Sequence, residues 1–426
     1  MPLHIAQFVH RYPPALGGAE AYIARLSEYL VSQGDSVTVW TTTAVELREL
    51  WSGISEPKAA ATTKAALVAH ASGSERISIR HYRPISFPLR RYILKALSFL
   101  PHRPWQAVFQ PVNPICPQMW KDAGTYNGPL DAVHATAFPY AFPILCAHRL
   151  AKRRKVPFLL TPFLHLGDPT DPRDRTRKQY TKPHLRWLLN EADTVFVQTP
   201  SERDAVVKLG VPENRVLLQG LGVDASECTG ISPPHPQPLS RQGRGEFRIG
   251  HLANNSIEKG TVDLLKAASA LNCKIVLAGA EMPNFEKFWQ GFDAKDCVTR
   301  LGVLTYEQKR DFFAGIDIFA LPSRTDSFGL VLLEAWANGK PVVAYRAGGP
   351  ADLVRHGVDG LLAKCGDVND LREQLRMLIE DEAMRKRMGE AGRERVAIEF
   401  QWEPKLKLFR DRIEQLQSEA EASAKP

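Results

Sequence analysis

The sequence predicts an α/β chain with two doubly wound domains, each a parallel sheet covered by helices. Its 426 residues, 44% of them hydrophobic and 24% charged, are enough for two separate cores. Near the start, a strand over 3–9, a glycine-rich turn, a helix and a strand over 36–40 follow one another. A second strand, turn, helix and strand fill 318–345. Such domains bind ligands at the carboxyl edge of the sheet, where these helices begin.

The most informative stretch is 320–349, ALPSRTDSFGLVLLEAWANGKPVVAYRAGG. Residues 328–337 are apolar almost all round and rich in helix formers, so we expect a buried helix. Its first amides lack intrahelical acceptors and lie at the positive end of the helix dipole. The amides of Ser327, Phe328 and Gly329 are therefore predicted to form an anion site.

Two carboxylates flank this predicted anion site. Asp326 precedes the helix and Glu334 lies eight positions later, about 12 Å away at the rise of an α-helix. A nucleotide-sugar spans a similar length, so one acid could hold the sugar and the other the ribose. Asp326 is equally suited to capping the helix. Glu334 lies among apolar neighbours and needs a partner.

The run from Asp326 to Ala335, followed by GKPVV and a Gly-Gly turn, resembles the motif of the group 1 retaining glycosyltransferases, family 4, which have the GT-B fold. In that motif two glutamates are separated by seven residues, and Asp326 stands in place of the first. The resemblance implies two Rossmann-like domains facing a cleft, with a C-terminal helix crossing back to the N-terminal domain. It also implies transfer of a sugar from a nucleotide-sugar to an acceptor hydroxyl, with retention and without a bound metal.

Other positions resemble the same family. Gly17 and Gly18 stand where the family has a loop that covers the donor diphosphate. Lys259 precedes a helix, where a cation opposes the helix dipole, and a diphosphate would explain its position. The family has an arginine after the preceding strand, and this chain has His251 there.

A histidine after a strand is the remaining family feature. His165 ends the run Thr161–His165, which follows a predicted strand and is similar to the family's Thr-x-His pattern with two residues inserted. His134 also ends a predicted strand and is a weaker match. Both positions are at the edge of the sheet where doubly wound folds bind ligands.

The resemblance also predicts the domain limits. We expect an N-terminal acceptor-binding domain over 1–226 and a C-terminal nucleotide-sugar-binding domain over 247–399. Residues 227–246 are rich in proline, glycine and serine and are predicted to be a linker or insertion. The last segment, 400–426, is the predicted returning helix.

The charge balance predicts an anionic partner. The net charge is +8, which suits a nucleotide or a phospholipid surface. Residues 90–105 mix basic, aliphatic and aromatic side chains, a pattern found at anionic membrane surfaces and also in ordinary packed helices. No helix-turn-helix or aromatic-interleaved RNA module is present, so nucleic acid is not an expected partner.

Cysteine usage and hydropathy bear on the compartment. The six cysteines are scattered singly, without a spacing typical of metal sites or disulfide frameworks. No apolar run reaches the length of a membrane span, and the first residues lack a signal-peptide pattern. We expect a cytoplasmic protein, with peripheral contact at the inner membrane face as an option.

The predicted function is that of a metal-independent retaining glycosyltransferase with no cofactor. It would use a UDP- or GDP-sugar donor and a glycan or lipid-linked acceptor. The predicted catalytic residues are His165, Asp326 and Lys259. The predicted donor-binding residues are Gly17, Gly18, His251, Lys259, Ser327, Phe328, Gly329 and Glu334. Two alternatives stay open: a GT-B sugar-nucleotide epimerase, and a nucleotide-sugar binding protein with weak or no catalysis.

Overall fold

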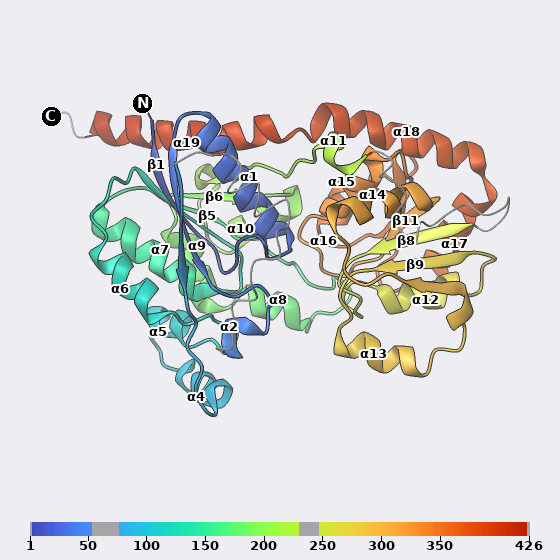
Figure 1. The fold of residues 1–426 in the computed structure, drawn as a ribbon, viewed down its shortest axis with the longest axis horizontal. Coiled ribbons are helices and arrows are strands. Elements are labelled where there is room, and N and C mark those ends of the chain that lie inside the picture. The colour runs from blue at the N-terminus through green and yellow to red at the C-terminus, as the bar shows by residue number, and fades with distance from the viewer. Residues whose placement is uncertain (1, 53–75, 230–246, 424–426) are drawn as a thin grey trace.

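The computed structural model describes residues 2–52, 76–229 and 247–423. Two parallel sheets lie side by side, each in its own domain (Figure 1). Most of the predicted linker, residues 230–246, lies outside the described residues. Within the described residues, no helix combines the length and the apolar character needed to cross a membrane.

The N-terminal domain contains a seven-stranded parallel sheet in the order β3-β2-β1-β4-β5-β6-β7. Its strands are β1 (His4–Phe8), β2 (Ser36–Thr42), β3 (Ile77–Tyr82), β4 (Ala132–Thr136), β5 (Phe158–Thr161), β6 (Thr194–Val197) and β7 (Val216–Leu218). Its helices are α1 (Gly18–Ser32), α2 (Glu49–Ser52), α4 (Arg90–Leu97), α5 (Arg103–Val108), α6 (Pro117–Thr125), α7 (Ala141–Arg154), α8 (Arg175–Tyr180), α9 (Pro183–Glu191), α10 (Pro200–Lys208) and α11 (Ala225–Cys228). The strand order reverses between β1 and β4, so ligands are expected at the carboxyl ends of these strands.

The C-terminal domain contains a six-stranded parallel sheet with a similar order, β10-β9-β8-β11-β12-β13. Its strands are β8 (Arg248–Leu252), β9 (Lys274–Ala278), β10 (Val298–Arg300), β11 (Ile318–Leu321), β12 (Val342–Tyr345) and β13 (Gly360–Ala363). Its helices are α12 (Thr261–Ala268), α13 (Pro283–Gln290), α14 (Tyr306–Gly315), α15 (Leu330–Ala337), α16 (Gly348–Leu353), α17 (Val368–Glu380) and α18 (Glu382–Glu399). The order reverses between β8 and β11, and α15 follows β11 at that edge. The predicted fold of two doubly wound domains is confirmed.

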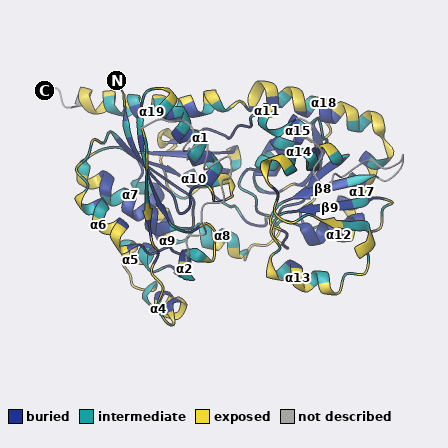
Figure 2. Cartoon of the chain, in the orientation of Figure 1, coloured by how far each residue is buried: buried dark blue, intermediate teal, exposed yellow. Residues whose placement is uncertain are grey.

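Burial follows the two sheets. Strands β4, β5, β6, β11, β12 and β13 are buried along their whole length, as expected of parallel strands covered on both faces (Figure 2). One apolar cluster continues from the N-terminal domain into the C-terminal domain, with Phe163 on one side and Phe328 and Leu332 on the other. The two carboxyl edges therefore meet through packed side chains.

The helix predicted over 328–337 is buried but begins two residues later than predicted. α15 starts at Leu330, because Gly329 has a left-handed conformation with φ of 98°. Phe328 therefore lies in the preceding loop, where its side chain is buried. Trp336 is fully buried, and its indole N–H donates to the Asp359 carbonyl at 2.8 Å.

The last helix returns to the first domain, as predicted. α19 (Trp402–Ser423) follows α18 and lies along the N-terminal domain (Figure 1). Phe409 is fully buried against His134 and Phe196. Arg410 forms an ion pair with buried Asp35 at 2.8 Å. The C-terminal helix α19 is therefore packed on the N-terminal domain.

Candidate functional site

The turn before α12 packs against the loop before α15. Lys259 Nζ lies 2.7 Å from Asp326 Oδ2. Gly260 has φ of 73°, and a Cβ there would lie 1.8 Å from the Pro322 carbonyl oxygen. Only glycine fits such a close approach of two backbones. Lys259 is therefore held beside the segment that leads into α15, where the sequence predicts an anion site.

Asp326 is charged at neutral pH because of its neighbours. Burial alone would raise its pKa, but the Lys259 ammonium and His165 hold the pKa of Asp326 below its usual value. The Phe328 N–H, 3.4 Å from Asp326 Oδ1, acts in the same direction. Asp326 is thus a partly buried carboxylate whose charge is balanced by one ammonium.

The Gly-Gly turn after β12 fixes the backbone of Asp326. The Gly349 N–H donates to the Asp326 carbonyl at 2.9 Å. Gly348 has φ of 52°, and a Cβ there would lie 2.3 Å from the same carbonyl oxygen. A Cβ on Gly349 would lie 2.4 Å from Phe328 Cα. Both glycines are required sterically, because a side chain would push the loop of Asp326 away.

Glu334 has the partner that its apolar surroundings require. Lys309 Nζ, on α14, lies 3.0 Å from Glu334 Oε1 and 3.3 Å from Oε2. Burial would lower the pKa of Lys309, yet the Glu334 carboxylate raises it above its usual value. At the end of α15, Asn338 Nδ2 donates to the carbonyl of Cys228, the last residue of α11, at 3.2 Å. Lys309 was not predicted from the sequence, where its only signal was the need for a cation near Glu334.

His165 reaches the C-terminal domain from the loop after β5. Its Nδ1 donates to the Thr325 carbonyl, next to Asp326. Burial, followed by the charge of Lys259, lowers the pKa of His165 to about 4. The ring is therefore neutral at neutral pH, with hydrogen on Nδ1 and a lone pair on Nε2.

The loop that carries His165 is held by a buried carboxylate. Glu202, in the first turn of α10, accepts hydrogen bonds from Leu164 N and Gln198 N, both at 2.6 Å. Phe163 turns the chain with φ of 50° and is buried against Tyr22. A positive φ in a bulky residue persists only where the surroundings impose it. The position of His165 is therefore fixed by its own domain.

His134 occupies a different place. It lies within β4, fully buried, with Nε2 2.9 Å from Thr161 Oγ1 and its ring against Phe409. Burial lowers the pKa of His134 to about 3. Of the two histidines considered from the sequence, His165 is the one that contacts the opposite domain.

Gly17 and Gly18 lie across from the start of α15. The Cβ position of Gly18 is 3.6 Å from Leu330 Cδ1, in the first residue of that helix. A Cβ on Gly17 would lie 2.2 Å from the Glu20 carboxylate. Glu20 in turn forms an ion pair with Arg11 at 2.6 Å. The glycine turn and the leading turn of α15, widely separated in sequence, therefore face each other.

His251 points into the protein. Its Nδ1 lies 2.8 Å from the Ala320 carbonyl, and its Nε2 lies 3.0 Å from Thr261 Oγ1. The ring is fully buried, and burial lowers its pKa to about 4. Both ring nitrogens of His251 have hydrogen-bond partners within the protein, so neither is left to bind a nucleotide-sugar in this arrangement. His251 holds β8 to β11 and α12 instead of providing a side chain at the site.

Arg324 joins the two domains and was missed from the sequence. Its guanidinium contacts Asp168 of the first domain at 2.8 Å and Asp263 of the second at 2.6 Å. Burial opposes its charge, but these two carboxylates raise the pKa of Arg324 above its usual value. Arg324 is two residues from Asp326, so its place in the motif was the available signal.

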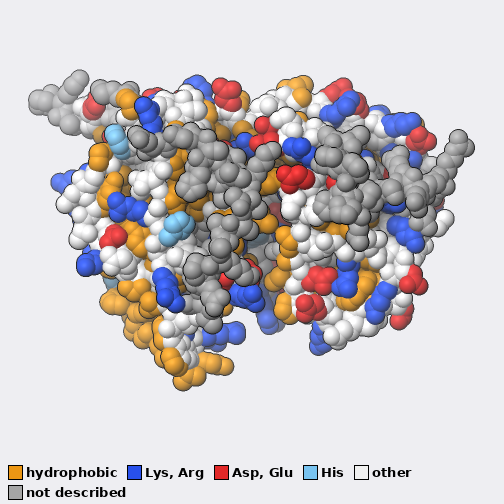
Figure 3. Space-filling view, in the orientation of Figure 1, with side chains coloured by type: hydrophobic (Ala, Val, Ile, Leu, Met, Phe, Trp, Pro, Cys, Tyr) orange, Lys and Arg blue, Asp and Glu red, His pale blue; other side chains and the backbone are white. Residues whose placement is uncertain are grey.

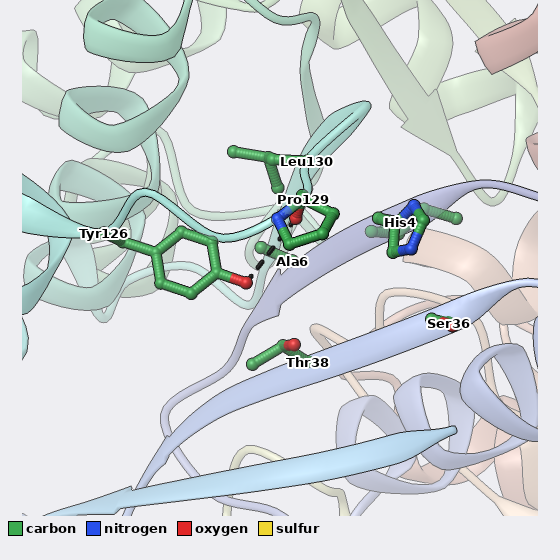
Figure 4. A pocket seen from close by; sticks show the side chains of 8 residues that line it. His4, Ala6, Ser36, Thr38, Tyr126, Pro129 and Leu130 are labelled. Atoms are coloured by element: carbon green, nitrogen blue, oxygen red, sulfur yellow. Dashed lines mark hydrogen bonds between the residues drawn. The ribbon is translucent and has the colours of Figure 1, made fainter. Parts of the chain in front are cut away.

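A separate cavity lies away from this arrangement. It has a volume of about 190 Å³ and is lined by His4, Ile5, Ala6, Ser36, Thr38, Tyr126, Pro129 and Leu130 (Figure 4). His4 and Ser36 are the first residues of β1 and β2, so the cavity is at the amino end of the sheet. Doubly wound domains bind ligands at the opposite edge. Among the described residues, no three His, Cys, Asp or Glu side chains are grouped as metal ligands.

Two family models match the chain. The model of the glycosyl transferase 4-like domain matches residues 17–222, and that of the glycosyl transferases group 1 matches residues 241–395. The chain belongs to the group 1 glycosyltransferases. Together the two matched segments include the glycine turn, the loop of His165 and the whole region around α15.

Curated relatives of this glycosyltransferase match over part of their length. An uncharacterized glycosyltransferase of Methanocaldococcus jannaschii is 27% identical, over 64% of this chain and 72% of its own. The sulfoquinovosyl transferase of Arabidopsis thaliana is 28% identical, over 62% of this chain and 52% of its own. A mannosyltransferase of Corynebacterium glutamicum is 39% identical, over 43% of this chain and 51% of its own. The chain thus spans about half the length of the last two.

Solved structures share the fold of this glycosyltransferase. HepE of Anabaena, in complex with UDP, has a TM-score of 0.68 at 18% identity and covers 97% of this chain and 100% of its own. Sucrose-phosphate synthase of Thermosynechococcus elongatus has a TM-score of 0.70 at 21% identity, over 98% and 99%. These likenesses confirm the GT-B architecture.

Proposed function

We propose that this glycosyltransferase moves a sugar from a nucleotide-sugar to an acceptor hydroxyl, with retention at the anomeric carbon and without a bound metal. The observation that carries the proposal is the pairing of Lys259 with Asp326 beside the leading turn of α15, opposite Gly17 and Gly18. An ammonium, a helix N-terminus and a side-chain-free turn together suit a diphosphate.

The proposed role of Lys259 is to stabilise the leaving diphosphate. An ammonium has three N–H donors, and Asp326 uses one of them. The amides of residues 327–329 and the dipole of α15 would add to the same stabilisation. Preorganised donors aimed at developing charge commonly supply the largest part of catalysis. This arrangement calls for no metal to neutralise the diphosphate.

The proposed roles of the two acids follow from their positions. Asp326 would accept hydrogen bonds from hydroxyls of the donor sugar, while the Lys259 ammonium keeps it ionised. Glu334 would bind the ribose, because Lys309 occupies one side of its carboxylate and leaves further lone pairs. The neutral ring of His165 would orient the sugar, and a diphosphate oxygen would take the acceptor proton.

The comparisons support the choice of donor and acceptor to test first. HepE of Anabaena is described in complex with UDP, with UDP and glucose, and with UDP-glucose. The Corynebacterium relative is described as a GDP-mannose-dependent enzyme acting on a phosphatidylinositol monomannoside. For this chain we therefore propose a UDP- or GDP-sugar donor and a glycan or lipid-linked acceptor.

A panel of UDP-, GDP- and ADP-sugars tested by thermal shift would identify the donor, since a ligand that binds the folded state raises Tm. With that donor, Glu334→Ala is expected to weaken binding at least tenfold by calorimetry, because two ribose contacts are lost. Glu286→Ala, at an exposed carboxylate on α13, is the matched control. Unchanged affinity in Glu334→Ala would remove Glu334 from the donor site, and no stabilisation by any nucleotide-sugar would contradict the proposed donor class.

A further inference from the structure

The end of the N-terminal domain formed by α4, the following turn and the start of α5 presents apolar side chains to solvent. We call residues 89–105 the α4–α5 tip. It projects from the domain at the bottom of the view in Figure 1, and Figure 3 shows hydrophobic side chains gathered there. Leu89 is 70% exposed, Tyr92 71% and Phe99 76%. Ile93, Leu100 and Trp105 are also exposed.

The exposed apolar residues form one face with helical spacing. Leu89, Tyr92, Ile93 and Ala96 follow the i, i+3, i+4, i+7 pattern, and the turn to Leu100 continues it. The opposite face of α4 is anchored differently. Leu94 is buried, and Arg90 is buried with its guanidinium donating to backbone carbonyls of residues 111 and 113. Within the described residues, the exposed apolar face of α4 is therefore separate from the face that packs on the domain.

The stretch of sequence that contains this face carries charges of one sign. Residues 76–121 contain eight Lys and Arg residues and no Asp or Glu. Arg91 and Lys95 are exposed and, one turn apart, lie on a third side of α4. Among the described residues, no carboxylate pairs with Arg91 or Lys95. An apolar face bordered by unpaired cations is complementary to lipid with anionic headgroups.

We propose that the α4–α5 tip docks on an anionic lipid surface. The aromatic and aliphatic side chains enter the boundary between headgroups and acyl chains, while Arg91 and Lys95 meet the headgroup charges. α4 follows the carboxyl end of β3, as the loop of His165 follows the carboxyl end of β5. Docking therefore turns the ligand-binding edge of the sheet toward the lipid. The docking itself does not depend on the proposed sugar transfer.

Vesicle flotation of the full chain tests the docking. The protein is mixed with vesicles of phosphatidylcholine alone, or of phosphatidylcholine and phosphatidylglycerol in equal parts. Binding is expected to the anionic vesicles and to fall with added salt, because surface charge attraction is screened. Equal binding to both vesicles, or binding to neither, would overturn the proposal.

Two double variants separate the contribution of charge to lipid binding from that of the apolar side chains. Arg91→Gln/Lys95→Gln is expected to lower the partition coefficient on anionic vesicles about 30-fold, because each basic residue near such a surface contributes a factor of about five. Its control is Lys208→Gln/Arg215→Gln, which removes two exposed charges elsewhere in the same domain. Equal loss in both pairs would mean that overall charge, and not the tip, governs binding, which would overturn the proposal.

Tyr92→Ser/Phe99→Ser tests the apolar face and is expected to lower binding about tenfold or more. Ile398→Ser, at a residue 80% exposed on α18, is the matched control. All of these substitutions are at exposed positions, and unchanged Tm would show that folding is intact. If the tip variant binds lipid like the parent but abolishes a concentration-dependent dimer, the face is an interface between copies of this chain and the lipid proposal fails.

Discussion

The two domains bring different chemistry to the place where they meet. The C-terminal domain contributes charges: Lys259 with Asp326, and Lys309 with Glu334. The N-terminal domain contributes a glycine turn and the neutral ring of His165. If the proposed function is right, the domain with these ion pairs supplies most of the contacts to a charged donor, and the neutral groups act on the sugar when the two domains are together. We therefore expect donor affinity to depend on one domain and turnover on both.

We call the groups from the C-terminal domain the charged half of the site and those from the N-terminal domain the neutral half. The two halves are also positioned in different ways. Around Asp326, positive-φ glycines let backbones approach closely, as Gly260 does against Pro322 and Gly348 does against the Asp326 carbonyl. Around His165, a buried carboxylate fixes the backbone. Glu202 accepts hydrogen bonds from the backbone N–H of Leu164, in the loop of His165, and from that of Gln198, which follows β6. Backbone contact leaves little freedom, so the charged half should be the more rigid of the two.

The largest expected effect comes from removing the central cation. Lys259→Met should lower kcat/KM by about a thousandfold, because charge on the leaving group loses its stabilising ammonium in a preorganised site. It should also destabilise the fold by about 3 kcal/mol, since the Asp326 carboxylate stays partly buried without a cation beside it. Transfer kinetics and urea unfolding measure the two effects.

The double variant Lys259→Met/Asp326→Asn separates these two roles of Lys259. Removing both charges should restore most of the stability, because no uncompensated carboxylate remains, while activity stays lost. If activity returned with stability, Lys259 would serve only to balance the charge of Asp326. Its proposed role in stabilising the leaving diphosphate would then be wrong.

A smaller effect on turnover is expected in the neutral half. His165→Ala should lower kcat about 100-fold and change donor affinity less than about threefold, because positioning of the sugar is lost while the charged contacts stay. His134→Ala should do the opposite: kcat stays near the parent value, and stability falls by about 2–3 kcal/mol, since a buried ring is removed and the Thr161 hydroxyl loses one of its partners.

The pH dependence of turnover tests whether the His165 ring is neutral, as its burial implies. The pKa of His165 is about 4 in the folded protein and about 6.5 unfolded, so its neutral form is kept until the pH falls toward 4. Turnover should therefore show no inflection from this group between about pH 5.5 and 8. An inflection near 6.5 that disappears in His165→Ala would show a ring that titrates freely, contrary to its position against Thr325.

The family motif made the charged half largely predictable. A lysine before one helix and an acid before another, both at the carboxyl edge of one sheet, had to come close, and Lys259 and Asp326 do. The start of α15 was predicted two residues early because Phe328 continues the apolar pattern, whereas the left-handed turn at Gly329 is a property of the backbone. Sequence periodicity does not register such a turn.

Side-chain direction was the part that the sequence could not supply. The motif predicts where the backbone of His251 lies, but its ring turns inward between Ala320 and Thr261. Lys309 lies 25 residues before its partner Glu334, and no local pattern links one face of α14 to one face of α15. Such pairings depend on how helices pack, which is decided by the whole core.

The smallest expected effect concerns the contact that joins the two halves. Asp168→Asn keeps an oxygen for the Thr170 N–H and hydroxyl but loses the ion pair with Arg324 across the domains. Arg324 keeps Asp263, so its charge stays balanced. A partly exposed pair contributes about 1 kcal/mol. KM should therefore rise about fivefold at nearly constant kcat, because the arrangement in which the two domains meet through this ion pair is less populated before substrate binds.

The control for this contact is Glu213→Gln, which removes an exposed ion pair with Arg203 inside the N-terminal domain. It is expected to leave KM unchanged, because it does not join the domains. If Asp168→Asn lowered Tm without changing KM, the ion pair would stabilise the fold alone. The contact between the two domains would then depend on apolar packing of Phe163, Phe328 and Leu332 and not on charge.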